Sequence, residues 1–427
     1  MNQPDFSYAD GAPSAGAGAS LEAVPDTAEL PSTERAADLA ELLRQVLELG
    51  ASDLHITPGV PPQVRIDGTL RPMEYARLAQ PETQELLSSV MTEDQKATLE
   101  ENLEVDFSFG LKDMARFRAN VFVQRGSIAG ALRLIPWSIP SFEDLGLPSV
   151  IADICEKPRG LVLVTGPTGS GKSTTLAAMI DLINRQKAHH IITIEDPIEY
   201  LHGHQRSIVN QRELGADTLS FAAAMRSALR EDPDCVLIGE MRDLESTELA
   251  LKLAETGHLT FATLHTNSAV QTINRVIDIF PTGQQAQIRT QLSFTLVAAI
   301  SQTLLPHSSG SGRVLAQEIL IPNPAIRNLI RESKIHQVYS AMQSGQAEHG
   351  MKTFTQDLAR LVMEEKITSE VAIAASGEEK ELSAMLERFN DASKGRTRLD
   401  REVAERVGLR KGKKPSRVRA RRIGRGR

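Results

Sequence analysis

Residues 161–175 read LVLVTGPTGSGKSTT, and this stretch decides how the chain folds. The apolar run at 161–164 predicts a short buried strand, and the run LAAMIDLI after the stretch predicts a helix. A strand, a glycine-rich loop and a helix in this order are what a phosphate-binding P-loop requires. The sequence therefore predicts an α/β protein with a nucleotide-binding loop at one edge of its sheet.

The loop has the pattern Gly166-x-x-x-x-Gly171-Lys172-Ser173. Its glycines let backbone N–H groups turn toward an anion without a Cβ atom in the way, and the helix N-terminus adds positive partial charge. We expect Lys172 to reach the β- and γ-phosphates of ATP and the Ser173 hydroxyl to bind Mg²⁺. A chance Gly/Ser turn is the alternative, which the complete spacing disfavours. The predicted ATP-binding residues of the loop are Gly166, Pro167, Thr168, Gly169, Ser170, Gly171, Lys172, Ser173 and Thr174.

The composition is that of a soluble globular protein. The chain has 427 residues, 41% hydrophobic and 24% charged, which is enough for two or three domains. No apolar run is long enough to span a bilayer, and the N-terminus lacks the basic start and apolar core of a secretory signal. Cys155 and Cys235 make neither a disulfide framework nor a zinc pattern. Together these features favour a cytoplasmic protein.

The net charge of −7 hides an asymmetry between the body of the chain and its end. Residues 410–427 hold ten Lys and Arg and no acid, which leaves 38 basic against 55 acidic residues in 1–409. Such a tail could contact anionic lipid, RNA or an acidic partner. A solvated, disordered end is the alternative, and the sequence does not choose between them.

The chain divides by pattern into successive parts. Residues 1–34, rich in Ala, Gly, Pro and Ser, are expected to be a disordered extension. Residues 35–135 predict a small α+β domain, with helices near 39–47 and 82–101, an Asp67-Gly68 hairpin turn within the strands of 52–72, and an alternating strand at 115–124. In that strand we expect Ala115, Phe117, Ala119, Val121 and Val123 to share one buried face.

The second half is predicted to be a mainly parallel α/β domain. Residues 136–148 contain three prolines and read as a linker. Within 149–376, apolar strands at 161–164, 191–194, 235–238 and 259–263 alternate with helical stretches. Beyond about 282 the pattern is mostly helical, with one strand-like run at 314–321. Residues 377–409 are expected to be a helical extension, and 410–427 a basic disordered tail.

Acidic residues follow the second predicted strand of this domain. Glu195, Asp196 and Glu199 come directly after residues 191–194. Because ligands sit at the carboxyl ends of parallel strands, these carboxylates are expected beside phosphate and Mg²⁺. There they could ligate the metal or orient an attacking water. A solvated acidic turn is the alternative.

The next strand ends in Gly239-Glu240-Met241-Arg242-Asp243. This is the position of a Walker B strand, but Gly239 stands where an Asp usually holds the metal. Glu240 is then the candidate for polarising water or stabilising the Mg²⁺ shell. Arg242 and Asp243 are equally well explained as a surface pair.

Two histidines, His258 and His265, bracket the following strand. Neutral imidazoles there could hydrogen-bond a γ-phosphate or relay its presence. A structural role is the usual explanation of a lone His, and a metal site is disfavoured because no ligand set is spaced around them. His202 and His204 are read as loop residues.

Phosphoryl transfer also needs positive charge near the γ-phosphate, often an arginine from another domain or subunit. The candidates on the strands of the small domain are Arg116, Arg118 and Arg133. Arg226 and Arg230, four apart on a predicted helix, could also serve. Each of these taken alone fits a surface salt bridge as well.

Taken together, the motifs resemble one family, the secretion ATPases of type II secretion and type IV pili. IEDPIEY at 194–200 resembles its Asp box, LIGEMRD at 237–243 its atypical Walker B motif, and ETGHLTFATLHT at 255–266 its His box. ASDLHIT and ARFRANVF before the linker resemble the PAS-like N-terminal domain of the family. The resemblance implies a P-loop RecA-like ATPase domain preceded by a small PAS-like domain.

Within the family, three segments resemble the members that retract type IV pili. These are GASDLHITPGVPPQVRIDG at 50–68, ALREDPDCVLIGEMRDLEST at 228–247 and AIRNLIRE at 325–332. Assembly and secretion members usually carry a tetracysteine insertion, which two lone cysteines exclude. The resemblance covers residues 36–375 and assigns no role to the two ends of the chain.

This resemblance implies a hexameric motor that hydrolyses ATP with Mg²⁺ at the cytoplasmic face of the inner membrane and powers pilus retraction. Its partners would be further copies of the chain, an inner-membrane platform protein and a paralogous retraction ATPase. Carried over by position, Glu199 and Glu240 serve hydrolysis, and His258 and His265 sense or contact the nucleotide. The arginines at 116, 118 and 133 would complete the site.

Three other functions remain open on the residues alone. A pilus-assembly or secretion ATPase would use the same chemistry. A ring motor that moves nucleic acid would use the basic tail as its grip, although nucleic acid is not the expected partner. A nucleotide-bound adaptor without turnover is the third, and the near-complete set of acidic and histidine motifs makes it the weakest.

Overall fold

The computed structural model describes residues 37–66, 68–111, 115–135, 138–344 and 350–389. The predictions for 1–34 and 410–427, and the end of the expected helical extension, lie outside these residues. The chain forms two compact units that meet in sequence between Leu134 and Ile135. Each unit is described by itself.

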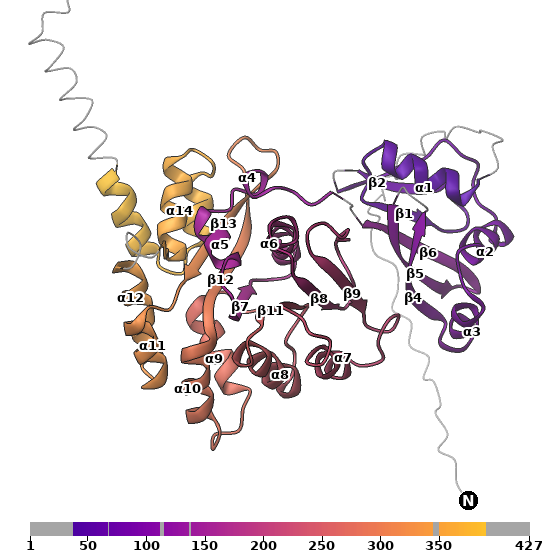
Figure 1. Cartoon of the computed structure of the whole chain (residues 1–427). Helices are drawn as coiled ribbons and strands as arrows, with labels where there is room; N and C mark the ends of the chain where they lie inside the picture. The colour runs from indigo at the N-terminus through magenta and orange to yellow at the C-terminus, as the bar shows by residue number, and fades with distance from the viewer. Residues whose placement is uncertain (1–36, 67, 112–114, 136–137, 345–349, 390–427) are drawn as a thin grey trace, which may run out of the picture. The chain divides into compact units, whose positions relative to one another are not determined.

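The first unit is a six-stranded sheet with helices, as its α+β pattern predicts (Figure 1). Its strand order is β3-β2-β1-β6-β5-β4. The pairs β1·β2, β2·β3, β1·β6 and β4·β5 are antiparallel. The likeness to a PAS domain stays a prediction. The elements are α1 (Leu39–Glu48), β1 (Asp53–Ile56), β2 (Gln63–Ile66), β3 (Thr69–Pro72), α2 (Gln80–Ser88), α3 (Glu93–Asn102), β4 (Glu104–Leu111), β5 (Ala115–Gln124) and β6 (Ser127–Ile135).

The helix predicted near 82–101 is two helices rather than one. The chain leaves helical geometry after α2, and Thr92 then caps α3 by accepting from the backbone N–H of Gln95. This capping box starts a new helix where the apolar periodicity alone would continue the old one. In β5 the predicted buried face is observed except at Val123, which is 36% exposed at the end of the strand.

The second unit contains a seven-stranded sheet with the order β13-β12-β7-β11-β10-β8-β9. Its six strands from β12 to β9 run parallel, and β13 pairs antiparallel with β12. The predicted mainly parallel α/β fold is therefore confirmed. The strands are β7 (Gly160–Thr165), β8 (His190–Glu195), β9 (Ile208–Glu213), β10 (Cys235–Ile238), β11 (Leu259–Leu264), β12 (Leu296–Pro306) and β13 (Arg313–Leu320).

The strand β12 corrects the expectation of a mostly helical chain beyond 282. It follows α10 without a break and pairs with β7 on one side and β13 on the other. Ala298, Ala299 and Ile300 are all fully buried. A strand buried on both faces shows no alternation of apolar and polar residues, so its sequence cannot be told from a buried helix by periodicity.

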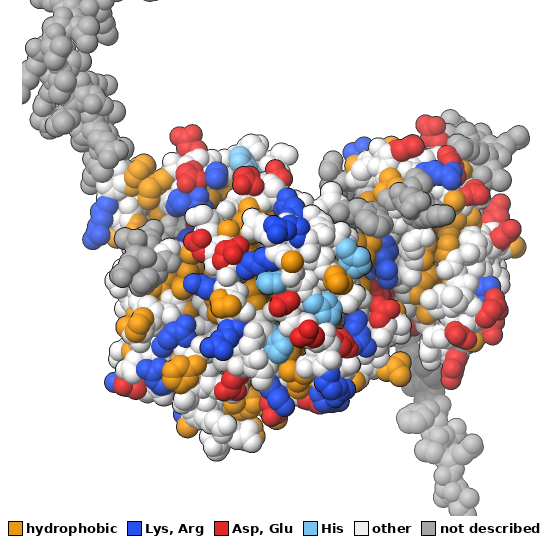
Figure 2. Space-filling view, viewed as in Figure 1, with side chains coloured by type: hydrophobic (Ala, Val, Ile, Leu, Met, Phe, Trp, Pro, Cys, Tyr) orange, Lys and Arg blue, Asp and Glu red, His pale blue; other side chains and the backbone are white. Residues whose placement is uncertain are grey.

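Helices cover both faces of this sheet (Figure 1). One buried apolar cluster joins the strands to α5 and α6, and another joins them to the helices from α7 to α12. Among the described residues, none of the helices has the length and hydropathy needed to cross a bilayer. Figure 2 shows charged side chains of both signs intermixed on the visible face of this unit. The helices are α4 (Phe142–Leu145), α5 (Ser149–Cys155), α6 (Lys172–Gln186), α7 (Phe221–Ala228), α8 (Leu244–Glu255), α9 (Ala269–Asp278), α10 (Gln285–Thr295), α11 (Pro324–Arg331), α12 (Val338–Ser344), α14 (Phe354–Met363) and α15 (Ser369–Ala375).

Candidate nucleotide-binding site

The glycine-rich loop connects the fully buried strand β7 to α6. Gly166 has a φ of +144°, and a Cβ atom there would lie 2.2 Å from the carbonyl oxygen of Gln302 and 2.6 Å from the hydroxyl of Ser170. Gly171 caps α6 with a φ of +86°. Both positions therefore require glycine, because of a close approach at the first and left-handed backbone at both.

Lys172 lies inside this loop. Its Nζ donates to the carbonyl oxygens of Gly166, at 2.9 Å, and Pro167, at 3.1 Å. Burial lowers the pKa of Lys172, and the carboxylates of Glu240 and Glu199 act in the opposite direction. The ammonium group thus sits at the mouth of the loop and faces the two predicted hydrolytic carboxylates.

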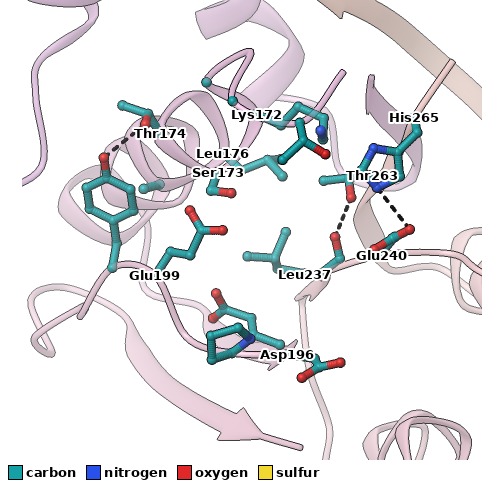
Figure 3. A pocket seen from close by; sticks show the side chains of 18 of the residues that line it. Lys172, Ser173, Thr174, Leu176, Asp196, Glu199, Leu237, Glu240, Thr263 and His265 are labelled. Atoms are coloured by element: carbon teal, nitrogen blue, oxygen red, sulfur yellow. Dashed lines mark hydrogen bonds and ion pairs between the residues drawn. The ribbon is translucent and has the colours of Figure 1, made fainter. Parts of the chain in front are cut away.

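A cleft of about 610 Å³ opens beside the loop (Figure 3). The parallel register places its lining at one edge of the sheet, because Thr165 at the end of β7 pairs with Leu264 and Ile194 pairs with Ile238. The cleft is lined by Lys172, Ser173, Glu199, Glu240, Thr263 and His265, among others. The prediction that these motifs gather at the carboxyl ends of the strands is confirmed for these residues.

The acidic stretch after β8 contributes carboxylates in different environments. Glu195 accepts hydrogen bonds from the Thr193 hydroxyl at 2.6 Å and from the Gln211 amide at 3.2 Å. Burial raises the pKa of Glu195 to about 7, against the effect of these hydrogen bonds. Asp196 and Glu199 are exposed. The carboxylate of Glu199 points toward Ser173 across the cleft (Figure 3).

Glu240 is held from two sides. Its Oε1 lies 3.1 Å from Nε2 of His265, and its Oε2 accepts from Nε of Arg242 at 2.9 Å. Arg242 also pairs with Asp196, with 3.2 Å between Nη1 and Oδ2. The hydrogen bond that Arg242 donates to Glu240 and the negative charges of Glu240 and Asp196 raise the pKa of Arg242. Arg242 is therefore part of the cleft and bridges two acidic segments, rather than forming a surface pair with Asp243.

The neighbours of Glu240 also have identifiable roles in the fold. Asp243 caps α8 by accepting from the backbone N–H of Ser246 at 2.8 Å. At Gly239 a Cβ atom would lie 3.2 Å from Cα of Glu195 and 3.3 Å from the carbonyl oxygen of Ile194. A side chain at this position would be in tight contact with the end of β8, which favours glycine here.

The two histidines lie at opposite ends of β11. His265 follows the strand and reaches the cleft, where it pairs with Glu240. His258 precedes the strand, and its Nδ1 is 3.0 Å from the carbonyl oxygen of Leu253. It lines a separate hollow with Lys187 and Asp234. A six-residue strand spans about 20 Å, so the structure does not bring His258 to the cleft of its own chain as the sequence led us to expect.

The candidate arginines are distributed over both units. In the first unit, Arg133 pairs with Asp53 at 2.8 Å and Arg118 with Asp106 at 3.6 Å. Arg116 alternates with buried residues on β5. The structure describes this unit by itself, so their part in the nucleotide site stays a prediction.

In the second unit, Arg226 pairs with Glu245 on α8. Arg230 lies in a turn beyond the end of α7, which stops at Ala228. The predicted helix face shared by the two arginines is therefore not formed. The described part of the cleft has its own arginines instead, Arg242 and Arg313.

Sequence reasoning missed two residues of the cleft, Arg313 and Tyr200, and Gln302, which contacts the loop without lining the cleft. Gln302 on β12 donates to the carbonyl oxygen of Ser170 at 3.0 Å, and Arg313 opens β13. Tyr200 pairs its hydroxyl with that of Thr174 at 2.9 Å. The first two lie on strands far along the chain, where no local spacing signals a nucleotide site, but the position of Tyr200 next to Glu199 was a usable signal.

The oxygen atoms in the cleft suit a hard cation such as Mg²⁺. The Ser173 hydroxyl, Glu199 and Glu240 all face the space beside the loop (Figure 3). The described residues contain no group of three His, Cys, Asp or Glu that would hold a metal by themselves. Mg²⁺ usually takes one or two protein ligands and completes its shell with water and phosphate oxygens.

A P-loop at the carboxyl edge of a parallel sheet, faced by acidic and histidine side chains from neighbouring strands, defines a nucleotide-binding protein of the P-loop class. More narrowly, the chain belongs to the family described as "Type II/IV secretion system protein", which matches residues 32–401. The family resemblance predicted from the motifs is thereby confirmed.

Relatives and solved structures match most of the chain. The type IV pilus retraction ATPase PilT of Pseudomonas aeruginosa is 51% identical over 78% of this chain and 97% of its own length. A twitching motility protein of Neisseria gonorrhoeae is 52% identical over 73% of this chain and 83% of its own. The crystal structure of the pilus retraction motor PilT with bound ADP is similar with a TM-score of 0.78 and 57% identity, covering 82% of this chain and 99% of that chain.

Proposed function

We propose that this chain hydrolyses ATP with Mg²⁺ and uses the energy to retract type IV pili. The observation that carries the proposal is the complete P-loop cleft, with Lys172, Glu199, Glu240 and His265 on one sheet edge. The names of the relatives support the second part of the proposal, that hydrolysis powers pilus retraction. PilT of Pseudomonas aeruginosa, named as a pilus retraction ATPase, is 51% identical over 97% of its length.

In this mechanism the loop binds the triphosphate. Lys172 exchanges its contacts with the carbonyl oxygens of Gly166 and Pro167 for the β- and γ-phosphates. The Ser173 hydroxyl would hold Mg²⁺, which, when bound, neutralises charge on the phosphate oxygens. The backbone N–H groups at the start of α6 add further positive potential toward the anion.

The carboxylates orient the attacking water. Glu240 is fixed by His265 and Arg242 on opposite oxygens, so its direction is set before substrate binds. It accepts a hydrogen bond from the water, and Glu199 faces the same space from the other side. His265 is placed to contact the γ-phosphate region and to report its loss through Glu240.

The proposal includes an assembly and a location. Six copies of the chain form a ring, in which arginines 116, 118 and 133 of the first unit complete the nucleotide sites. The ring works at the cytoplasmic face of the inner membrane. It passes its motion to a platform protein in that membrane and cooperates with a paralogous retraction ATPase.

Pilus assembly is the competing function, because it uses the same chemistry. The assembly ATPase PilB of Thermus thermophilus is 34% identical to this chain over only 32% of its own length. The similarity to PilB is weaker than the similarity to PilT, and this difference supports retraction over assembly. A nucleic-acid motor is less well supported, because relatives that match most of this chain are named for pilus retraction and twitching motility.

Two measurements test the proposal. The purified chain should release phosphate from ATP, and Lys172→Ala should abolish the release. Deletion of the gene should leave cells covered with unretracted pili, a state that wild-type protein reverses and Lys172→Ala does not. Cells without surface pili after deletion would contradict retraction and support assembly.

A further inference from the structure

The segment 196–202, which we call the Glu199 loop, is fastened to the edge strand β9 by side chains. The backbone N–H of Ile198 donates to Glu213 at 3.1 Å. Gln211 accepts from the N–H of His202 at 2.8 Å and donates to the carbonyl oxygen of Tyr200 at 2.8 Å. The residues on both sides of Glu199 are thus fixed relative to β9.

The same loop is joined to the helix that begins at the P-loop. The hydroxyls of Tyr200 and Thr174 are hydrogen-bonded, with 2.9 Å between the oxygens (Figure 3). Tyr200 directly follows Glu199, and Thr174 directly follows Ser173. The contact therefore links the residue beside the proposed hydrolytic carboxylate to the residue beside the proposed metal ligand.

This geometry has a consequence for Glu199. Its side chain is exposed, so packing does not fix the carboxylate, and the position of its backbone limits how close the carboxylate can come to Ser173. The hydrogen bonds to Glu213 and Gln211 hold the backbone of the Glu199 loop on β9. The Tyr200 hydroxyl holds the same loop against α6. Without that hydroxyl the loop would keep its hydrogen bonds to β9 but could move away from the first turn of α6.

We propose that the Tyr200–Thr174 hydroxyl pair is a positioning contact that sets the distance between Glu199 and Ser173. The inference rests on the proposed ATP hydrolysis and deepens it, since neither residue need contact the reacting atoms. A misplaced catalytic group lowers the rate more than it lowers substrate affinity. Loss of the hydrogen bond should therefore lower kcat and leave KM almost unchanged.

The test compares variants that differ by one hydroxyl group. Tyr200→Phe removes one partner and is expected to lower kcat about three- to ten-fold with KM for Mg-ATP within about two-fold. Thr174→Val removes the other partner and should lower kcat by a similar factor, while its KM also reports the predicted contact of Thr174 with ATP. Tyr339→Phe is the matched control, because its hydroxyl lies outside the cleft, 3.1 Å from Glu381 and 3.2 Å from Thr355.

The double variant shows whether the two hydroxyls act together. If they do, Tyr200→Phe with Thr174→Val loses no more activity than the worse single variant. A loss equal to the product of the single losses would overturn the inference, as would a Tyr200→Phe protein with wild-type kcat. The melting temperature of each variant shows whether it is folded.

A second readout does not depend on turnover. Hydrogen exchange of residues 196–202 should be faster in Tyr200→Phe and Thr174→Val than in wild type, and unchanged in Tyr339→Phe. Wild-type protein that hydrolyses no ATP would refute the proposed function, and the exchange experiment would still decide this inference. Equal exchange in all four proteins would overturn it.

Discussion

His265 and Glu240 form a pair on one side of the cleft, with 3.1 Å between Nε2 and Oε1, and follow the ends of the neighbouring strands β11 and β10. The pair joins the His box to the atypical Walker B motif directly. Because Arg242 holds the other oxygen of Glu240, the carboxylate cannot turn without breaking one of these contacts. The geometry assigns Glu240 a fixed direction before nucleotide binds.

Glu240→Gln should therefore bind ATP and hydrolyse it slowly. The substitution keeps the shape of the side chain but removes the charge that accepts a hydrogen bond from water. We expect kcat to fall by on the order of 10²-fold, with the dissociation constant of a fluorescent ATP analogue within about three-fold of wild type. Glu245→Gln is the control, because Glu245 pairs with Arg226 outside the cleft. Full turnover in Glu240→Gln would show that another group orients the water.

Substitution of the two histidines should have different effects on ATP binding and hydrolysis. His265→Gln is expected to lower kcat about ten-fold, because it loses the imidazole contact to Glu240. His258→Gln should leave the affinity of the chain for ATP within about two-fold, since His258 lies beyond the opposite end of β11. Titration of both variants with a fluorescent ATP analogue, beside phosphate release, makes the comparison. A large loss of affinity in His258→Gln would contradict the placement of its side chain.

Two glycines of the loop should tolerate alanine differently. Gly166→Ala puts a Cβ atom 2.2 Å from a backbone oxygen, so the loop must shift. We expect it to lose nucleotide binding and to cost about 2–4 kcal/mol of unfolding free energy. In Gly169→Ala the new Cβ atom meets no other atom within 4 Å. The left-handed φ of +77° alone should lower the unfolding free energy by about 1 kcal/mol. Urea unfolding and ATP titration of both variants test this, and equal effects would contradict the close approach at Gly166.

Glu195 should give the protein a measurable pH dependence of stability. Burial raises its pKa from 4.5 to about 7 in the folded state, so between these values the folded chain holds a proton that the unfolded chain has lost. Its contribution to stability is present below about pH 4.5 and is lost as the pH rises toward 7, by at most about 1.4 kcal/mol per pH unit.

Glu195→Gln does not titrate and should remove this part of the slope. Its amide oxygen can still accept from the Thr193 hydroxyl, so the variant isolates the charge. Urea unfolding of both proteins from pH 5 to 8 provides the measurement. Parallel curves for wild type and variant would mean that Glu195 is ionised throughout this range.

Much of the site could be predicted from local patterns. The spacing of Gly166, Gly171 and Lys172 fixed the strand, loop and helix, because only that arrangement satisfies an anion with backbone groups. Glu199, Glu240 and His265 each follow a predicted strand, and residues that follow parallel strands lie at the same edge of the sheet. Their gathering in one cleft could therefore be predicted. The bounds of β10, Cys235–Ile238, agree with the predicted strand.

The rest depends on contacts between distant parts of the chain. A histidine beside a parallel strand can face the nucleotide only if it follows the carboxyl end of that strand. His265 follows β11, whereas His258 precedes it, so the prediction that both contact the nucleotide was wrong for His258. The strand β12 was missed because its buried, alanine-containing sequence has no period of two. Arg133 pairs with Asp53, which is 80 positions earlier in the sequence and shows no local signal of the pair.

One consequence follows from the position of β12 in the sheet. Within the strand Gln302 contacts the P-loop through Ser170, and at the start of the strand Arg327 of α11 donates to the carbonyl oxygen of Leu296 at 3.1 Å. The strand between them pairs with β7, with an irregularity between Leu296 and Ala298, and with β13 from Ala299 onward. The P-loop and the segment AIRNLIRE thus contact the same strand at points about 20 Å apart, so one element of the sheet connects the nucleotide cleft to this C-terminal segment.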